Sequence, residues 1–415
     1  MNILAYIFSG ISLMMSGFFL LRPSTKLLMV LFLPLIAAAL SPLWAIFGVI
    51  GAVLGWVSGA IWAMPLGIIG AVWMTWYIWV ATRDHNGFDN AFGPDWQDQI
   101  TPAIARKMLN RRWVPFVNLK ASPQPVVERD IPFWTIPGTD RKLLCDVWRP
   151  ANGKTSSLAY IYLHGSAWAI GDKDMFTRFF FRHLAAQGHT VMDVSYRLIP
   201  EVDLYGMVGD AKRAVAWMKA NADRFGVDPE KVVLGGGSAG AHIALLAGYT
   251  PKLPELTPEE LNGSDLSVCG LLTYYPPTDL EAGAQRYNNE HKPPVPLGTK
   301  VDPKNPMLYA GRLDILLGGY PEDVPDMYRL ACPTTHVNPG SPPTLSLRGD
   351  RDCLNPQDGN EQLYANLVEA GVPAIDVVLP WTEHGFDLAF PQVNPSAQSA
   401  MYDVDRFLAL VLNRN

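Results

Sequence analysis

The sequence predicts an α/β fold: a doubly wound, mostly parallel sheet with a cap insertion, preceded by transmembrane α-helices. The first observation is the charge distribution, because Arg22 and Lys26 are the only charged side chains in residues 1–82 of the 415-residue chain. The second is the alternation of short apolar strands with helical segments from residue 126 onward, which is typical of parallel sheets. The third is a Gly-x-Ser-x-Gly sequence at residues 236–240, between an expected strand and an expected helix.

The apolar N-terminal part predicts three membrane spans within residues 1–83. Residues 3–21 are uncharged and long enough to cross a bilayer. A cleaved signal peptide fits poorly, because no basic residue precedes this run and Arg22-Pro23-Ser24 is not a small-residue cleavage site. Residues 27–82 carry no formal charge and favour two further spans that break near residues 55–59. An earlier break at Ser41-Pro42 would make three tight spans there and four in all.

Basic residues indicate the orientation of these spans. Arg22 and Lys26 lie in the first loop, and a second basic group follows the last span, at Arg83, Arg106, Lys107, Arg111 and Arg112. Three spans put both groups on one side, so the positive-inside rule predicts a cytoplasmic soluble domain, whereas four spans would separate them. Aromatic residues cluster just before Arg83, as expected where a helix meets lipid headgroups: Trp73, Trp76, Tyr77 and Trp79.

Residues 84–122 form a connector between the spans and the soluble domain. Thr101-Pro102 can begin a helix, with Ile104, Met108 and Trp113 on one side of it. Such a helix can rest on the membrane surface or pack on the soluble domain, and the sequence does not decide between the two.

The soluble domain is expected to cover residues 123–415. Expected strands are residues 126–136 and 142–148, both taken as edge strands, then 158–163, 190–196, 231–234, 267–274, 344–347 and 375–379. Expected helices are 208–224, 239–249 and 397–412. Residues 276–342 are rich in Pro, Asn and Gly and too long for a simple connection, so a cap over the site is expected there.

The four cysteines have no metal-type spacing and are expected to be buried or free thiols. A net charge of −6 gives no reason to expect nucleic acid as a partner.

The glycine-flanked Ser238 is the expected nucleophile. A match to Gly-x-Ser-x-Gly is weak alone, but this one follows a short apolar strand and opens a small-residue helix. A serine hydroxyl must sit in a tight turn there, and its neighbours must be small because the backbones crowd. The helix N-terminus then points its positive dipole end at a developing oxyanion.

A serine nucleophile needs a base and a group that orients the base. His384 lies in a loop after an expected strand, where ligand chemistry sits in such sheets. His242 is four residues after Ser238 on the same helix and is interpreted as packing. Asp352 follows the strand at residues 344–347 and precedes His384, which gives the order Ser, Asp, His. Asp350 stays open as the alternative, because spacing does not separate two acids in one loop.

Three motifs resemble the α/β-hydrolase superfamily in its hormone-sensitive-lipase-like and acyl-esterase branch. That branch has an HGGGW-type loop, a Tyr-Arg-Leu-x-Pro-Glu stretch and a G-x-S-A-G elbow, which here are residues 164–168, 196–201 and 236–240. The elbow is nearest to feruloyl/acetyl esterases and kynurenine formamidases, and residues 238–243 are also similar to membrane-bound plant prenylcysteine methylesterases. The resemblance covers about residues 143–412 and implies oxyanion donors at the N–H groups of Gly165, Ser166 and Ala239. Ser166 replaces a loop glycine, which narrows the pocket beside the acyl group.

These residues together predict a membrane-anchored serine hydrolase that cleaves carboxylic esters through an acyl-enzyme, with no metal or organic cofactor. The expected partners are the bilayer and a small-molecule or lipid-like ester.

Amide or formamide cleavage by the same triad stays open, as does a non-catalytic hydrolase-like membrane protein. The glycines at positions 235, 237 and 240 also match a dinucleotide fingerprint, but no acidic residue ends a strand about 20 residues later. The acyl and alcohol groups are not readable from the sequence.

Overall fold

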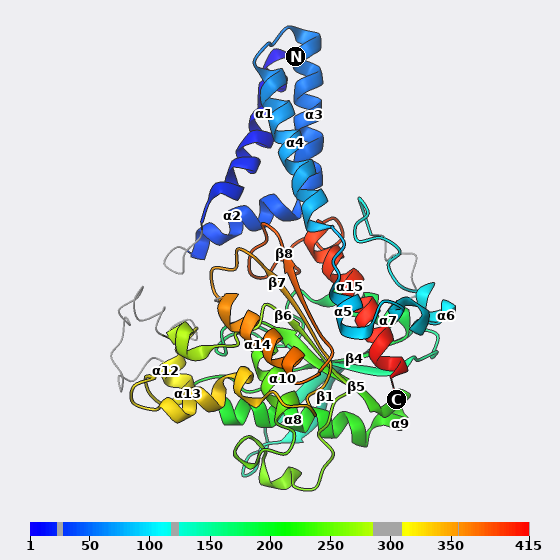
Figure 1. Ribbon diagram of the computed structural model, residues 1–415, viewed down its shortest axis with the longest axis vertical. Coiled ribbons are helices and arrows are strands. Elements are labelled where there is room, and N and C mark those ends of the chain that lie inside the picture. Colours follow the sequence, from blue (N-terminus) through cyan, green and yellow to red (C-terminus); the bar gives the residue numbers. More distant parts are fainter. Residues whose placement is uncertain (23–27, 118–123, 285–308, 356, 415) are drawn as a thin grey trace.

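The computed structural model describes residues 1–22, 28–117, 124–284, 309–355 and 357–414, and it consists of a helical stalk on an α/β body (Figure 1). The stalk contains α1 (Asn2–Gly17) with the 3-10 turn η1 (Phe18–Leu20), α2 (Leu28–Ala39), α3 (Ser41–Ser58) and α4 (Ala63–Ala81). Among the residues that the structure describes, three stretches are long and apolar enough to cross a membrane: Asn2–Leu20, Ser41–Ser58 and Ala63–Ala81. The break expected near residues 55–59 is present, since α3 ends at Ser58 and α4 begins at Ala63. The alternative break at Ser41-Pro42 is also present, but α2 before it has only 12 residues.

Small residues line the contacts inside the stalk, and large apolar residues face outward. A Cβ added at Gly48, Gly51 or Gly67 would overlap the backbone of a neighbouring helix. Ser9 Oγ donates a hydrogen bond of 2.7 Å to the carbonyl of Ala63. Large apolar side chains are exposed along the stalk, among them Ile3, Ile46, Val53, Trp56, Val57, Ile61, Trp62, Ile69 and Val72. This arrangement is the reverse of a water-soluble bundle and is typical of helices that pack within lipid.

The body is built on one eight-stranded sheet in the order β1-β2-β4-β3-β5-β6-β7-β8. The strands are β1 (Val126–Thr135), β2 (Lys142–Arg149), β3 (Ser157–Leu163), β4 (Thr190–Val194), β5 (Val227–Gly237), β6 (Gly270–Tyr274), β7 (Thr344–Gly349) and β8 (Ala374–Leu379). All pairs from β4 to β8 are parallel, and β2 is antiparallel to both β1 and β4. The expected fold class is therefore confirmed. The expectation that β2 is an edge strand is wrong, since it pairs on both sides.

Helices cover both faces of the sheet because side chains of each buried strand alternate between the two faces. Ile161 of β3 belongs to the core that includes α8 (Leu204–Ala220), α10 (Ala239–Tyr249) and α14 (Gln357–Glu369). Its neighbours Tyr160 and Tyr162 belong to the opposite core, with α5 (Gly87–Phe92), α7 (Arg178–Gln187) and α15 (Pro395–Asn413). The remaining short helices are η3 (Trp96–Gln99), α6 (Pro102–Ala105), α9 (Ala222–Phe225), η5 (Pro254–Leu256), η6 (Glu259–Leu261), α12 (Leu313–Leu317), α13 (Pro325–Ala331) and η8 (Pro333–His336).

The connector packs on the body near α15. Its helix α6 begins at Pro102 as expected but ends at Ala105, so Met108 and Trp113 lie beyond it. The Trp113 indole donates to the carbonyl of Val393, and Arg112 forms an ion pair with Asp403 of α15.

The expected cap at residues 276–342 is described only in part, since residues 285–308 lie outside the described residues. Its described helices α12 and α13 share the core of α8 and α10. The four cysteines form no disulfide, as expected, and Cys145 and Cys332 are buried.

Candidate active site

The elbow after β5 holds Ser238 in a conformation that its neighbours enforce. Ser238 has φ 52° and ψ −122°, which is strained for a residue with a Cβ. Its N–H donates to the carbonyl of Tyr274 on β6 at 2.9 Å, and α10 begins at the next residue. A Cβ at Gly236 or Gly240 would overlap the carbonyl oxygen of Leu163, so only glycine permits this approach of β5 and α10 to β3. The turn therefore presents the Ser238 hydroxyl at the N-terminus of a buried helix.

The structure brings His384 and Asp352 to this hydroxyl. His384 Nε2 lies 3.0 Å from Ser238 Oγ, and His384 Nδ1 lies 2.8 Å from Asp352 Oδ2. Asp352 Oδ1 accepts hydrogen bonds from the N–H groups of Leu354 at 2.8 Å and Asn355 at 3.0 Å. Asp352 is buried, so its carboxylate is fixed by the loop and is not free to rotate into water. The arrangement can draw a proton from Ser238 and stabilise the resulting imidazolium.

Asp350, the alternative acid, has no hydrogen bond to the imidazole. It accepts a hydrogen bond from the N–H of Thr382, at 3.4 Å, and partial burial raises its pKa above the ordinary value. The Asp350 side chain therefore stabilises the loop that carries His384.

The loop after β3 lies against the nucleophile, where an oxyanion would form. A Cβ at Gly165 would come within 3.2 Å of Ser238 Cβ, which places this backbone beside the hydroxyl. The N–H groups of Gly165 and Ser166 donate to none of the acceptors among the described residues. Ser166 has φ 98°, and Ala167 and Trp168 also have positive φ, so the loop is held in a strained form. The N–H groups of Gly165 and Ser166 are therefore held in place and available to donate hydrogen bonds to an oxyanion.

Several polar groups around this loop have structural roles. Tyr196 Oη donates a 2.7 Å hydrogen bond to the carbonyl of His164, and the two rings stack at 4.5 Å. The Trp168 indole N–H donates to His242 Nδ1 at 3.2 Å, and His242 Nε2 lies 2.7 Å from the carbonyl of Ala331. His242 is thus a packing residue, as expected, and burial lowers its pKa to about 4. Together these contacts fix the loop that carries Gly165 and Ser166.

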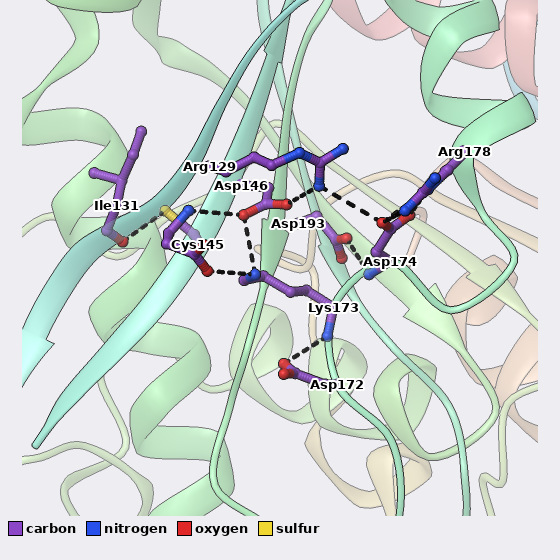
Figure 2. Close-up of polar contacts among 10 residues, drawn as sticks. Arg129, Ile131, Cys145, Asp146, Asp172, Lys173, Asp174, Arg178 and Asp193 are labelled. Atoms are coloured by element: carbon purple, nitrogen blue, oxygen red, sulfur yellow. Dashed lines mark hydrogen bonds and ion pairs between the residues drawn. The ribbon is translucent and has the colours of Figure 1, made fainter.

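An ionic cluster supports the part of the β3–α7 connection that contains Lys173 and Asp174, and this segment forms another wall of the site. Figure 2 shows Arg129, Asp146, Lys173, Asp174 and Asp193 converging between the strands and this loop. Lys173 bridges Asp130 at 2.7 Å and Asp146 at 3.1 Å, and the N–H of Asp174 donates to Asp193 at 2.6 Å. Burial raises the pKa of Asp193 well above its ordinary value.

The next residue along this loop, Met175, lines the pocket, and the Ser166 hydroxyl donates to its sulfur at 3.3 Å. The cluster therefore holds a wall of the pocket in place.

Tyr275 and Asp387 are two further site residues that the sequence did not predict. The Tyr275 ring packs 4.3 Å from the His384 ring, and its hydroxyl donates to Asp387 at 2.6 Å. Asp387 is partly buried, and the loss of solvation raises its pKa to about 6. The only signals in the sequence are that Tyr275 follows β6 directly and that Asp387 comes three residues after His384.

The pocket beside Ser238 has a volume of about 270 Å³ and mostly apolar walls. It is lined by Tyr162, Gly165, Ser166, Ala167, Met175, Gly237, Ser238, Tyr275, Leu354, His384, Gly385 and Leu388. Within the described ranges, no group of three His, Cys, Asp or Glu side chains is placed to hold a metal ion.

Comparison with known proteins matches this chain to one family over most of the body. The BD-FAE family profile matches residues 145–367, which is more than half of the chain. The chain belongs to the BD-FAE family. The match begins in β2 and ends in α14, so it includes the elbow and Asp352.

The curated relatives of this chain include esterases. Esterase LipQ of Mycobacterium tuberculosis is 27% identical over 349 residues, which cover 81% of this chain and 77% of LipQ. Esterase LipC of the same organism is 30% identical over 253 residues, which cover 60% of this chain and 59% of LipC. The expected enzyme class, a carboxylic ester hydrolase, is confirmed by these relatives.

Solved structures share the fold. A truncated carbohydrate esterase from gut microbiota aligns with a TM-score of 0.57 at 19% identity, covering 71% of this chain and 100% of that one. Apo esterase 2 of Thermogutta terrifontis aligns with a TM-score of 0.53 at 23% identity, covering 69% of this chain and 94% of that one. At this identity the likeness extends to the α/β-hydrolase fold, which the sequence resemblance predicted.

Proposed function

We propose that this chain is a membrane-anchored serine hydrolase that cleaves carboxylic esters with the triad Ser238, His384 and Asp352. The observation that carries the proposal is the continuous line of contacts from Ser238 Oγ through both imidazole nitrogens to Asp352 Oδ2, at 3.0 and 2.8 Å. A serine at a strained elbow, with its base in hydrogen-bonding reach and that base oriented by a buried carboxylate, is equipped for acyl transfer.

The mechanism follows from these positions. Ser238 Oγ attacks the ester carbonyl carbon while His384 Nε2 takes the hydroxyl proton, and Asp352 stabilises the imidazolium. The N–H groups of Gly165, Ser166 and Ala239 receive the carbonyl oxygen as its negative charge develops. His384 then protonates the leaving alcohol, and the acyl group remains on Ser238. Water, activated by His384, attacks this acyl-enzyme and releases the acid.

Membrane anchoring is proposed from the stalk and from the position of its charges. Helices α1, α3 and α4 carry small residues inside and large apolar residues outside, which fits a lipid environment. Arg22 and Arg83 follow the ends of the first and last spans that meet the body, whereas the turn between α3 and α4, residues 59–62, has no charge. By the positive-inside rule the body therefore lies on the cytoplasmic side. We accordingly divide the chain into an anchor (residues 1–83), a connector (84–122) and a catalytic domain (123–415).

The test is hydrolysis of p-nitrophenyl acetate, butyrate and palmitate by the detergent-solubilised protein, beside Ser238→Ala. The proposal predicts turnover that the substitution abolishes. The matching p-nitroanilides measure amide cleavage, and N-formylkynurenine measures formamide cleavage. Faster turnover of either than of the esters would move the assignment to the amide and formamide hydrolases with the same triad. No turnover of any of these substrates would favour a non-catalytic protein with this fold.

A further inference from the structure

We propose that the substrate is a long-chain ester dissolved in the bilayer, which enters the pocket from the membrane side. This inference rests on the proposed function, because it needs both the anchor and the Ser238 triad. It goes beyond that function in naming the class of ester and its route.

The first step is that both triad loops are attached to the stalk. Arg351, which precedes Asp352, donates to the carbonyl of Phe19 at the end of the first span, and its guanidinium stacks 3.4 Å from the Trp381 ring. Trp381 in turn packs edge-on against Trp73 and Trp76 of α4, each at 5.6 Å. We call Arg351, Trp381, Trp73 and Trp76 the junction cluster. Figure 1 shows the carboxyl ends of β7 and β8 directly beneath the stalk.

The second step is that the pocket lies within a short chain length of this junction. Leu354, which lines the pocket, is three residues from Arg351, and His384 is three residues from Trp381. Three residues span at most about 11 Å. The pocket residues of these two loops therefore lie within about 11 Å, along the backbone, of the loop residues that contact the stalk.

The third step is that exposed aromatic side chains lie near the same loop. Phe390 follows the pocket residue Leu388 by two positions and is 50% exposed, and Phe116 of the connector is 61% exposed. The two segments are joined by the hydrogen bond from the N–H of Val117 to the carbonyl of Gln392, at 2.8 Å. Exposed phenylalanines are costly in water but stable at the boundary of headgroups and acyl chains. We call Phe116 and Phe390 the aromatic rim.

These three observations favour a bilayer route over a water route. A pocket with mostly apolar walls, attached to the anchor and bordered by the aromatic rim, can receive an acyl chain without its transfer through water. Each methylene of such a chain favours the bilayer by about 0.8 kcal/mol, so an ester with a long chain is concentrated there and leaves slowly.

The experiment compares two arrangements of the full chain reconstituted in phosphatidylcholine vesicles. In the first, 4-methylumbelliferyl palmitate is in the same vesicles as the protein, and in the second it is in separate vesicles. Entry from the bilayer predicts an initial rate at least about ten-fold higher in the first arrangement, because exchange of the long chain between vesicles is slow. Equal rates in the two arrangements would overturn the proposal.

Water-soluble 4-methylumbelliferyl acetate separates this failure from a failure of the proposed function. Acetate turnover that Ser238→Ala abolishes supports the esterase assignment whatever the vesicle result. Absence of acetate and palmitate turnover alike would overturn the esterase assignment and this inference with it.

Substitutions in the aromatic rim give a second readout. Phe116→Asp with Phe390→Asp is expected to lower same-vesicle palmitate turnover by roughly ten-fold relative to acetate turnover. Aspartate suits position 390, where φ is 48°. The matched control is Val368→Asp on α14, also an exposed apolar position at 53%, which should keep the wild-type ratio. An unchanged ratio in the rim variant would contradict the assigned route.

Discussion

Replacement of Asp352 by Asn should nearly abolish turnover without disturbing the fold. The asparagine oxygen can still accept the N–H groups of Leu354 and Asn355, which now donate to Asp352 at 2.8 and 3.0 Å. The amide NH₂ would then face His384 Nδ1, where the carboxylate now lies at 2.8 Å. Because NH₂ is a donor, the imidazole must accept at Nδ1 and carry its proton on Nε2. His384 would then have no lone pair to receive the Ser238 proton.

The expected loss is about 10⁴-fold in kcat, which corresponds to about 5.5 kcal/mol of transition-state stabilisation. The assay is kcat and KM for p-nitrophenyl butyrate, with Ser238→Ala as the floor and a thermal melt to verify folding. Asp350→Asn is the matched control. The Asp350 carboxylate faces the backbone N–H groups of Trp381 and Thr382 and not the imidazole, so the turnover of Asp350→Asn should stay within a few-fold of wild type. A large loss in Asp350→Asn together with a small loss in Asp352→Asn would refute the assignment of the acid.

Three further predictions concern strain and buried ionisable groups. Ser166→Gly should raise the free energy of unfolding by about 1 kcal/mol, because the φ of 98° at this position suits glycine; denaturant titration measures this. The same variant should still hydrolyse esters but prefer bulkier acyl groups, which rates on acetate and benzoate esters measure. Burial lowers the pKa of His242 to about 4, so its contribution to stability is present above pH 6.5 and is lost, by about 3 kcal/mol, as the pH falls toward 4. The melting temperature of His242→Gln should therefore fall less steeply than that of wild type over this pH range, and an equal fall in both proteins would contradict the role of His242. Burial, with Asp352 nearby, raises the pKa of Glu383 to about 8, so the contribution of Glu383 to stability should decline as the pH rises from about 4.5 to 8. Glu383→Gln should remove this contribution, a few kcal/mol over that range, and identical pH profiles of the two proteins would contradict it.

The alternation of strands and helices and the elbow were predictable because both depend on local sequence. The continuous apolar run of β3, which is buried from Leu158 to Leu163, and the glycines around Ser238 leave few alternatives to a buried strand and a tight turn. The position of β2 was not predictable in the same way. Its place between β1 and β4 depends on pairing with a strand more than 40 residues away along the chain, which no local pattern encodes.

The identity of the acid and the support of the histidine depend on tertiary contacts. Asp350 and Asp352 have the same local setting, and only the course of the loop decides which carboxylate meets His384. Tyr275 and Asp387 become neighbours of His384 only when β6 and the loop after β8 meet at one edge of the sheet.

The sequence alone predicts that the tryptophans before Arg83 lie among the lipid headgroups. Trp73 and Trp76 instead pack against Trp381 of the body, and Trp79 alone among the three is largely exposed. Composition near a span does not distinguish an aromatic side chain that meets lipid from one that meets protein.

The central claim is that Ser238 is an activated nucleophile, and fluorophosphonate labelling tests it most directly. The measurement is the intact mass of the full chain after labelling in detergent, followed by peptide mapping, for wild type and for Ser238→Ala. The account predicts one adduct on Ser238 in wild type, none in Ser238→Ala, and greatly slowed labelling in His384→Ala, because the hydroxyl needs its base. Equal labelling of wild type and Ser238→Ala, or an unlabelled but folded wild type, would contradict it.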